Sequence, residues 1–322
     1  MTITRRCAFS VFGCAFLIST AEAQTYPAKP VRIVVGFPPG SGTDIVARVA
    51  AQKLAELLGQ QMIVDNRPGA GANIAADAVA KAAPDGYTLL VAQNALAISP
   101  ALYRNLPYDA MRDLTAVGGI AAAPHILLVH RSLPVNSVKD LIALAKRRPG
   151  ELNYASSGVG INDHMCGELL RALTGINVVH VPYKGGNLAV ADVVNGQITY
   201  FFAGMPVGLP MHKSGRLKGL AVTSKDRYKG VPELPTVAES GVPDYEVVLW
   251  QALFAPAATP PAVIARVSDE LGRARQSPDM RDWLANSGVE VFESDATQFG
   301  TFFRREIAKW GKVIKDAGLK AE

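Results

Sequence analysis

Cysteine is scarce in this sequence, with three residues among 322. Cys7 and Cys14 lie within the first 23 residues, so the rest of the chain holds Cys166 alone. A single cysteine excludes an internal disulfide framework. Cys166 lies in a segment with helical apolar spacing, where a lone cysteine is more often a small core residue than a catalytic thiol.

Basic clusters and long apolar runs are also absent. The chain has 33 Lys and Arg against 28 Asp and Glu, a net charge of +5, but the basic residues occur singly or in pairs. That scatter excludes the basic stripe of a nucleic-acid-binding face. Beyond the N-terminal segment, no apolar stretch reaches the roughly 20 residues that a spanning helix needs. With 49% hydrophobic and 19% charged residues, the composition is that of a globular protein large enough for two domains.

The first 23 residues predict an export signal. Arg5 and Arg6 precede an apolar run at residues 7–18, and Ala21-Glu22-Ala23 matches the small-x-small pattern before a cleavage site. We therefore expect residues 1–23 to be a signal peptide and the mature chain to begin at Gln24 in the periplasm. The arginine pair fits either an ordinary n-region or a twin-arginine signal, so the export route stays open.

Two series of alternating strands and helices follow, each in the order β-α-β-α-β. They lie at residues 31–92 and 126–223. This alternation predicts an α/β fold with mostly parallel sheets flanked by helices, in two hinged lobes with a cleft between them. We expect lobe 1 at residues 24–124 plus about 253–295, lobe 2 at 125–252, and a C-terminal helix at 296–322 that packs across to lobe 2.

One strand in each series breaks into a Gly/Ser-rich loop that opens a helix. The loops are FPPGSGTD at residues 37–44 and YASSGVGIN at residues 154–162. Backbone N–H groups at a helix N-terminus bind an anion without a cationic side chain, and ligands bind at the carboxyl ends of such strands. One Gly-rich turn more often only packs a helix on a sheet, but two equivalent loops favour a clamp. The candidate site residues are Phe37, Pro39, Gly40, Ser41, Gly42, Thr43 and Asp44 from the first loop and Ser156, Ser157, Gly158 and Gly160 from the second.

Four further residues are candidates for the same cleft. Tyr183 and Lys184 follow a strand of the second series, and Asn94 and Ala203 are expected in the cleft wall. Lys184 is equally consistent with an exposed turn. Asp44 has two interpretations, because a carboxylate in the first helical turn stabilises the helix dipole and can also accept a ligand ammonium.

Several catalytic and cofactor-binding patterns are missing. Ile45 stands where the dinucleotide fingerprint needs Gly or Ala, and the sequence has neither the Gly-Lys-Ser/Thr of a P-loop nor a Gly-x-Ser-x-Gly elbow. His164 and Glu168 are spaced to share a metal, but no further His or Cys cluster lies near them, which favours a structural pair. We therefore expect no catalytic residue, no metal and no cofactor.

Six phrases carry a family resemblance. They are FPPGSGTD (37–44), NRPGAGANIAADAVAKAAPDGYTLL (66–90), YASSGVGINDHMCGE (154–168), VPYKG (181–185), GRLKGLAVTS (215–224) and LPTVAESG (234–241). Together, and in this order, they resemble the periplasmic solute-binding receptors of the tripartite tricarboxylate transporter family, also called Bug receptors. The resemblance implies a type II Venus flytrap of the periplasmic-binding-protein class. It also implies a small carboxylate held by backbone groups and ordered water between the two loops.

The resemblance further implies delivery of the ligand to the permease subunits of a membrane transporter. A ligand sensor for a membrane signalling partner stays open, as does an exported hydrolase that uses His164 and Glu168. We expect a monomer without a nucleic-acid partner. The sequence departs from the common family pattern in two candidate ligand loops. Ser41 stands where a third glycine is frequent, and residues 93–96 (QNAL) stand where a small-residue and Thr/His stretch is usual. The identity of the ligand therefore stays open among dicarboxylates, tricarboxylates, acidic amino acids and aromatic acids.

Overall fold

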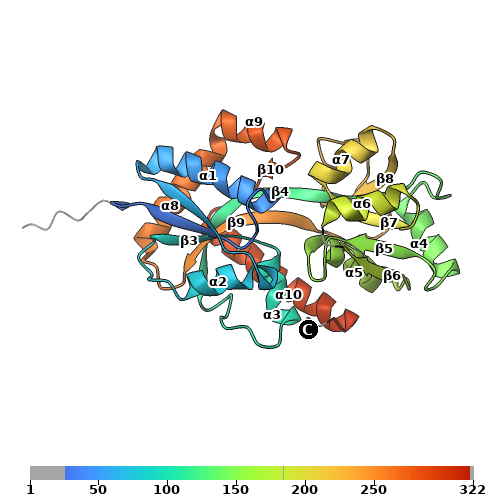
Figure 1. Ribbon diagram of the computed structural model, residues 1–322, viewed down its shortest axis with the longest axis horizontal. Coiled ribbons are helices and arrows are strands. Elements are labelled where there is room, and N and C mark those ends of the chain that lie inside the picture. Colours follow the sequence, from blue (N-terminus) through green and yellow to red (C-terminus); the bar gives the residue numbers. More distant parts are fainter. Residues whose placement is uncertain (1–25, 184, 320–322) are drawn as a thin grey trace, which may run out of the picture.

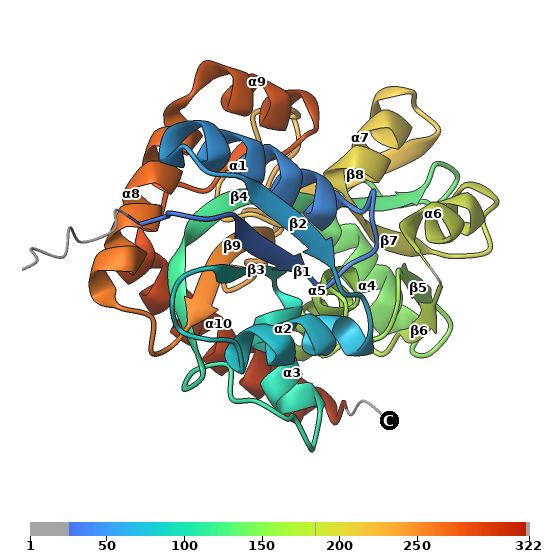
Figure 2. The same ribbon diagram turned by 60° about the vertical axis from the view of Figure 1, so that its left-hand side comes forward.

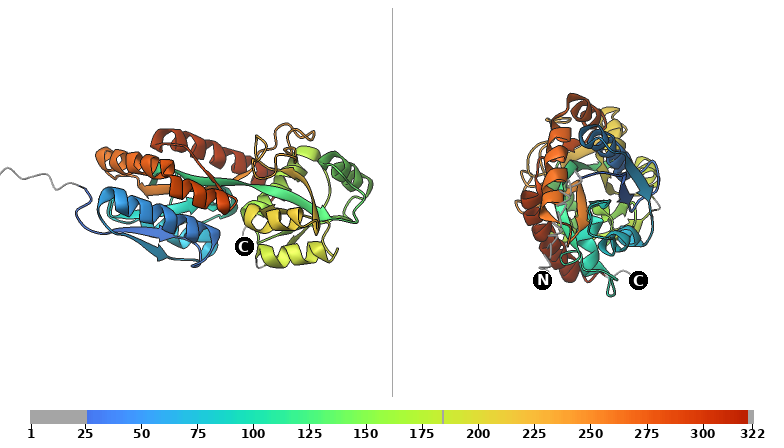
Figure 3. Two further views of the ribbon diagram at one scale, coloured as in Figure 1. Left: turned by 90° about the horizontal axis from the view of Figure 1, so that it is seen from above. Right: turned by 90° about the vertical axis from the view of Figure 1, so that its left-hand side faces the viewer.

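The protein consists of two α/β lobes joined by two long strands (Figure 1). The structure is a computed structural model, and it describes residues 26–183 and 185–319. The expected signal peptide at residues 1–23 and the candidate site residue Lys184 lie outside the described residues. Figure 3 shows the lobes end to end along the long axis of the molecule.

Lobe 1 begins with the first predicted series of alternating strands and helices, in which helices cover both faces of a sheet. Its elements are β1 (Val31–Val35), α1 (Gly42–Leu58), β2 (Met62–Asn66), the 3-10 turn η1 (Ala70–Ala72), α2 (Asn73–Ala80), β3 (Thr88–Gln93) and α3 (Ala95–Leu102). β1 pairs in parallel with β2 and β3. Successive side chains of a strand point to opposite faces, so Ile33 packs with the cluster under α1 and Val34 with the cluster under α2 and α3. Figure 2 shows α1 on one side of this sheet and α2 and α3 on the other.

Lobe 2 has the same layered plan. Its elements are α4 (Val138–Arg147), β5 (Asn153–Ser156), α5 (Asn162–Thr174), β6 (Val179–Pro182), α6 (Gly186–Val194), β7 (Tyr200–Gly204), α7 (Met205–Lys213) and β8 (Leu217–Val222). β5 pairs in parallel with β6 and β7. α4 and α5 pack on one face of this sheet, and α6 and α7 pack on the other.

β4 (Leu114–His130) and β9 (Val248–Pro256) run between the lobes. The first part of β4 pairs antiparallel with β9 as far as Pro124 opposite Val248, and the rest pairs with β7 and β8. The sequence predicts a strand only at residues 126–129, and the structure extends it back to Leu114. The added part is rich in Gly and Ala, which have low strand propensity, so its extended conformation depends on the partner strand β9.

Thr223 links β4 to the start of β9 by hydrogen bonds at the point where these two connections leave lobe 2. Its side chain is 0% exposed; the hydroxyl accepts from the His125 N–H at 2.7 Å and donates to the Val247 carbonyl at 2.7 Å. The backbone N–H of Val247 in turn donates to the Thr223 carbonyl at 2.8 Å. Burial lowers the pKa of His125 to about 4, so this junction is uncharged at neutral pH.

The end of the chain returns to lobe 1 and then reaches lobe 2. It forms α8 (Pro261–Gln276), α9 (Pro278–Asn286), β10 (Glu290–Val291) and α10 (Ala296–Ala317). α10 packs on α3 and β4 and also contacts α5 of lobe 2. Phe299, Phe303 and Trp310 are buried along α10, and Phe299 and Phe303 pack against the ring of Trp250, so these side chains form a packing surface. No helix in the described part of the chain is long and apolar enough to cross a membrane.

The α/β class is confirmed, but the sheets are mixed rather than mostly parallel. β3 with β9, and β4 with β7, β8, β9 and β10, pair antiparallel. Two helices, α3 and α7, were not predicted because each contains prolines, Pro100 in α3 and Pro206 and Pro210 in α7. Proline normally ends a helix, so pattern reasoning places loops at these positions.

Candidate ligand cleft between the lobes

The first loop is held in place by the carboxylate of Asp44. Its Oδ2 accepts from the Gly40 N–H at 2.8 Å and from Arg48 Nε at 3.0 Å, and its Oδ1 accepts from Asn66 Nδ2 at 2.8 Å. Burial raises the pKa of Asp44, but the hydrogen bonds from Arg48, Asn66 and Gly40 outweigh it, so the net pKa lies below its ordinary value. Asp44 is 1% exposed and bonds to its own loop. The alternative role as acceptor of a ligand ammonium is therefore not supported.

The same loop leaves two backbone donors at the start of α1. Ser41 is the N-cap, whose Oγ accepts from the Asp44 N–H at 3.3 Å, while its own N–H donates to the Pro38 carbonyl at 3.2 Å. The N–H groups of Gly42 and Thr43 have no acceptor among the described residues. Pro39, Gly40 and Gly42 are exposed and Thr43 is buried. Gly42 and Thr43 are thus the donors that loop 1 offers to an anion.

Asp163 organises the second loop in the same way. Its carboxylate accepts from the Ser157 N–H at 3.0 Å, from the Ser157 hydroxyl and from the His164 N–H at 2.8 Å. Burial raises the pKa of Asp163 to about 6, against the opposing effect of these hydrogen bonds. The Ser156 hydroxyl donates to the Gly158 carbonyl at 3.0 Å. Both serine side chains therefore bond within the protein, although we expected them to face the ligand.

A column of stacked rings lies beneath the second loop. His164 stacks on His180 with ring centroids 4.0 Å apart, and its Nδ1 accepts from the Gly160 N–H at 3.1 Å. Glu168 accepts from the Tyr154 hydroxyl at 2.5 Å and from Arg171 at 2.7 Å. Burial lowers the pKa of His164 to about 3. His164 and Glu168 are thus a buried structural pair, and the described residues contain no group of three metal-ligating side chains.

The second loop meets lobe 1 at Gly160. This residue has φ +75°, and a Cβ built there would lie 2.4 Å from Cδ2 of Leu102 on α3. The left-handed backbone therefore favours glycine, and the absence of a Cβ lets this loop approach Leu102 closely. Because Leu102 belongs to lobe 1 and Gly160 to lobe 2, the contact forms one end of an interlobe cleft.

The cleft at this contact is a small pocket of about 60 Å³. Its lining comes from both lobes: Phe37, Gly71, Gln93, Ala95, Ile98, Ser99, Leu102 and Tyr103 from lobe 1, and Val159, Gly160, Ile161 and Asn162 from lobe 2. Asn162 is 3% exposed, and neither its Nδ2 nor its Oδ1 has a hydrogen-bond partner among the described residues. An unpaired buried amide is costly, so its place in a pocket makes Asn162 a candidate ligand contact.

Asn162 also begins a helix that has no side-chain cap. The N-cap position of α5 is Ile161, whose side chain cannot accept a hydrogen bond. The N–H groups of Ile161 and Asn162 find no acceptor in the described chain. Lobe 2 therefore offers backbone donors and an amide at one point, next to the positive end of the helix dipole.

The pocket brings together Phe37 and Gly160 of the predicted residues. Three others are corrected. Asn94 donates to the Val248 carbonyl at 2.9 Å and accepts from the Trp250 N–H at 3.0 Å, so its amide fixes β9. Ala203 is 0% exposed under Gly208 of α7 and cannot line the cleft, and the Tyr183 hydroxyl donates to Asp192 on α6 at 2.6 Å.

Sequence reasoning missed most of the pocket wall. Gln93 is the last residue of β3 and Ala95 the first of α3, at the sheet edge where ligands bind, and this position was a usable signal. In the sequence, Asn162 has the pattern of an ordinary helix cap. Only the lack of hydrogen-bond partners for its side chain in the structure distinguishes it from one. Ile98, Leu102 and Tyr103 lie on or beside α3, the helix that its proline concealed.

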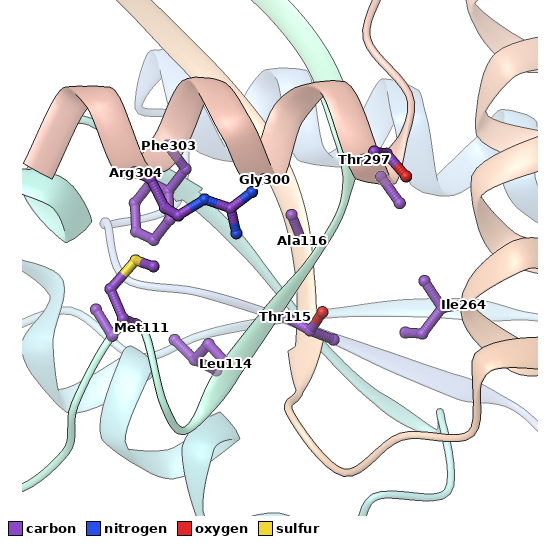
Figure 4. Close-up of a pocket in the computed structure, with 11 residues that line it drawn as sticks. Met111, Leu114, Thr115, Ala116, Ile264, Thr297, Gly300, Phe303 and Arg304 are labelled. Atoms are coloured by element: carbon purple, nitrogen blue, oxygen red, sulfur yellow. The ribbon is translucent and has the colours of Figure 1, made fainter.

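A larger hollow of about 330 Å³ lies inside lobe 1, away from the cleft. Figure 4 shows Phe303 and Arg304 of α10 on one side, Met111 and Leu114 below them and Ile264 opposite. Arg304 is exposed and donates to the Thr301 hydroxyl of its own helix at 3.3 Å. The hollow contains no buried unpaired polar side chain. The hollow is therefore larger than the interlobe pocket at Asn162 but has no comparable buried group free to recognise a ligand.

Comparisons with known proteins place this chain in a family. Residues 46–319 match the model of the tripartite tricarboxylate transporter family receptor. The chain is 37% identical over 308 residues to the protein BugT of Bordetella pertussis, covering 95% of this chain and 94% of BugT.

Solved structures agree with this match. An R. palustris protein with adipate has a TM-score of 0.79 and 36% identity, covering 92% of this chain and 100% of that one. MatC from Rhodopseudomonas palustris with bound malate has a TM-score of 0.76 and 30% identity, covering 90% and 100%. The chain therefore belongs to the receptor family of the tripartite tricarboxylate transporters and is a solute-binding receptor of the TctC/Bug type.

Proposed function

We propose that this receptor captures a small organic carboxylate in the periplasm, between its two lobes, and delivers it to a tripartite tricarboxylate-type membrane transporter. The observation that carries the proposal is the unpaired amide of Asn162, buried in the interlobe pocket at an uncapped helix N-terminus. A carboxylate oxygen accepts hydrogen bonds and carries the charge that a helix N-terminus favours. Relatives solved with adipate and with malate support this ligand class.

Donors in the two lobes would share the ligand. Loop 1 offers the N–H groups of Gly42 and Thr43, and loop 2 offers those of Ile161 and Asn162. A carboxylate that bonds to both sets stabilises the arrangement in which the lobes are close, because those bonds form only there. This division of donors is the physical basis of a flytrap.

Ligand entry requires the lobes to separate. The pocket of about 60 Å³ lies beside the contact between Leu102 of lobe 1 and Gly160 of lobe 2, so an organic acid reaches it only when the lobes move apart. β4 and β9 are the connections that would bend, and we place the lobe boundary where β4 changes partners, near Pro124. Small-angle scattering should show a smaller radius of gyration with ligand than without it, and an unchanged radius would remove the closing motion from the proposal.

A calorimetric titration with a panel of organic acids tests the binding role. We expect saturable binding of at least one carboxylate. Asn162→Ala should weaken it by about 1–3 kcal/mol, because a hydrogen bond to a charged ligand is lost. The matched control is Asn286→Ala at the exposed end of α9, which should bind like the parent protein.

The unfolding temperature of the Asn162→Ala variant shows whether weaker binding comes from a lost ligand contact or from a less stable fold. Because the amide is unpaired in the described structure, its removal should leave the unfolding temperature without ligand unchanged or higher. Weaker binding without loss of stability identifies a ligand-contacting residue. Absence of binding by every acid in the panel would refute the proposal, whereas uptake in vesicles with the permease subunits tests the delivery step.

A further inference from the structure

The walls of the interlobe pocket are largely apolar. Phe37, Ile98, Leu102 and Tyr103 of lobe 1 face Val159 and Ile161 of lobe 2 across the pocket. None of the described lining residues is charged, and the polar side chains among them are Gln93, Ser99, Tyr103 and Asn162. A pocket of this kind provides a few neutral donors and a hydrophobic surface.

Two of these apolar side chains are unusually accessible. Val159 is 55% exposed and Ile161 is 38% exposed, although both lie on the loop that meets lobe 1. Apolar side chains gathered at a cleft mark a surface that a partner covers. Because the loop that carries Val159 and Ile161 contacts Leu102 of lobe 1, the partner that covers these side chains is a ligand bound between the lobes.

We infer, on the basis of the function proposed above, that the preferred ligand is an organic acid with an apolar body, and not a short hydroxylated dicarboxylate or tricarboxylate. One carboxylate bonds to the unpaired amide of Asn162 in this pocket. The hydrocarbon part lies against Val159, Ile161, Phe37 and Leu102. A hydroxyl group on that part would lose its hydration against these four side chains, none of which offers a hydrogen-bond partner.

A comparison of three acids of equal charge tests this preference. Adipate has two more methylene groups than succinate, and malate differs from succinate by one hydroxyl. Each buried methylene strengthens binding about fourfold, so adipate should bind on the order of 10-fold more tightly than succinate. Malate should bind at least about threefold more weakly than succinate, because its hydroxyl is desolvated.

A pair of matched variants locates the preference in the cleft. Val159→Ser makes the pocket wall polar and should reduce the ratio of adipate affinity to succinate affinity several-fold. Val179→Ser replaces a valine of similar exposure, 49%, on the outer strand β6, and should leave that ratio unchanged. Equal unfolding temperatures for the two variants exclude a general loss of structure.

The outcomes separate the inference from the function on which it rests. Tighter binding of adipate, with the ratio reduced only by Val159→Ser, supports the inference. Tighter binding of malate or succinate than of adipate overturns the apolar-body inference but leaves a carboxylate receptor in place. Binding of none of these acids overturns both.

Discussion

Replacing Thr223 by valine should destabilise the junction between the lobes. Valine has nearly the same shape but lacks the hydroxyl, so the His125 N–H and the Val247 carbonyl each lose a partner at 2.7 Å. Thr223 is 0% exposed, and water cannot replace the lost bonds. A buried group left unpaired costs about 1–3 kcal/mol, so the two together should lower the free energy of unfolding by roughly 2–6 kcal/mol.

Urea unfolding followed by tryptophan fluorescence measures this change. Thr223→Ser keeps the hydroxyl and loses one methyl group, so it should cost only about 1 kcal/mol. Thr301→Val on the exposed face of α10 should change the free energy of unfolding by less than about 0.5 kcal/mol. The reasoning is refuted if Thr223→Val costs no more than Thr223→Ser.

Two further predictions concern loop 1 and helix α5. Asp44→Asn should lower the free energy of unfolding by about 1.5–3 kcal/mol at neutral pH, because hydrogen bonds to a charged acceptor are lost. The folded pKa of Asp44 lies below its ordinary value, so this contribution is present above about pH 4 and disappears as the pH falls through the folded pKa. Unfolding curves from pH 3 to 7 should therefore converge at acid pH, and a constant gap would contradict the assignment. Gly167→Ala places a Cβ 2.2 Å from Cε2 of Tyr154 and should destabilise the protein by about 1–3 kcal/mol. Gly311→Ala on α10 places a Cβ with no atom within 4 Å and should stabilise the protein by up to about 1 kcal/mol. Thermal unfolding of both variants checks the opposite signs, and equal signs would count against the packing argument.

The helices and strands with regular apolar spacing were predictable from the sequence. Helix α1, Gly42–Leu58, was predictable because apolar residues recur at helical spacing along it. Most of β4 was not predictable, because Gly118, Gly119 and their alanine neighbours adopt a strand only through pairing with β9. Helices α3 and α7 were hidden by their prolines.

The candidate site was predictable in its loops but not in its contacts. The glycines and hydroxyls marked the loops at residues 37–44 and 154–162, and the structure places Phe37 and Gly160 in the pocket. The sequence could not show that Asp44 and Asp163 use the loop hydroxyls and several N–H groups for internal bonds. A hydroxyl that caps a helix and one that binds a ligand occur in the same sequence pattern. The unpaired amide of Asn162 becomes apparent only when all neighbours are placed.

The most direct test of a carboxylate shared between the lobes is a calorimetric titration of Gly42→Pro. Gly42 is the first residue of α1, where proline fits the helix, and Ser41 has the extended backbone, ψ 157°, that precedes proline readily. The substitution thus removes one unpaired N–H of lobe 1 while preserving the fold, and Ala296→Pro at the start of α10 is its control.

The account predicts that Gly42→Pro weakens the binding of the carboxylate by about 1–3 kcal/mol, as Asn162→Ala does from the other lobe, and that the control binds normally. Unchanged affinity of Gly42→Pro, with Asn162→Ala still impaired, would place the carboxylate on lobe 2 alone and contradict a ligand held between the lobes.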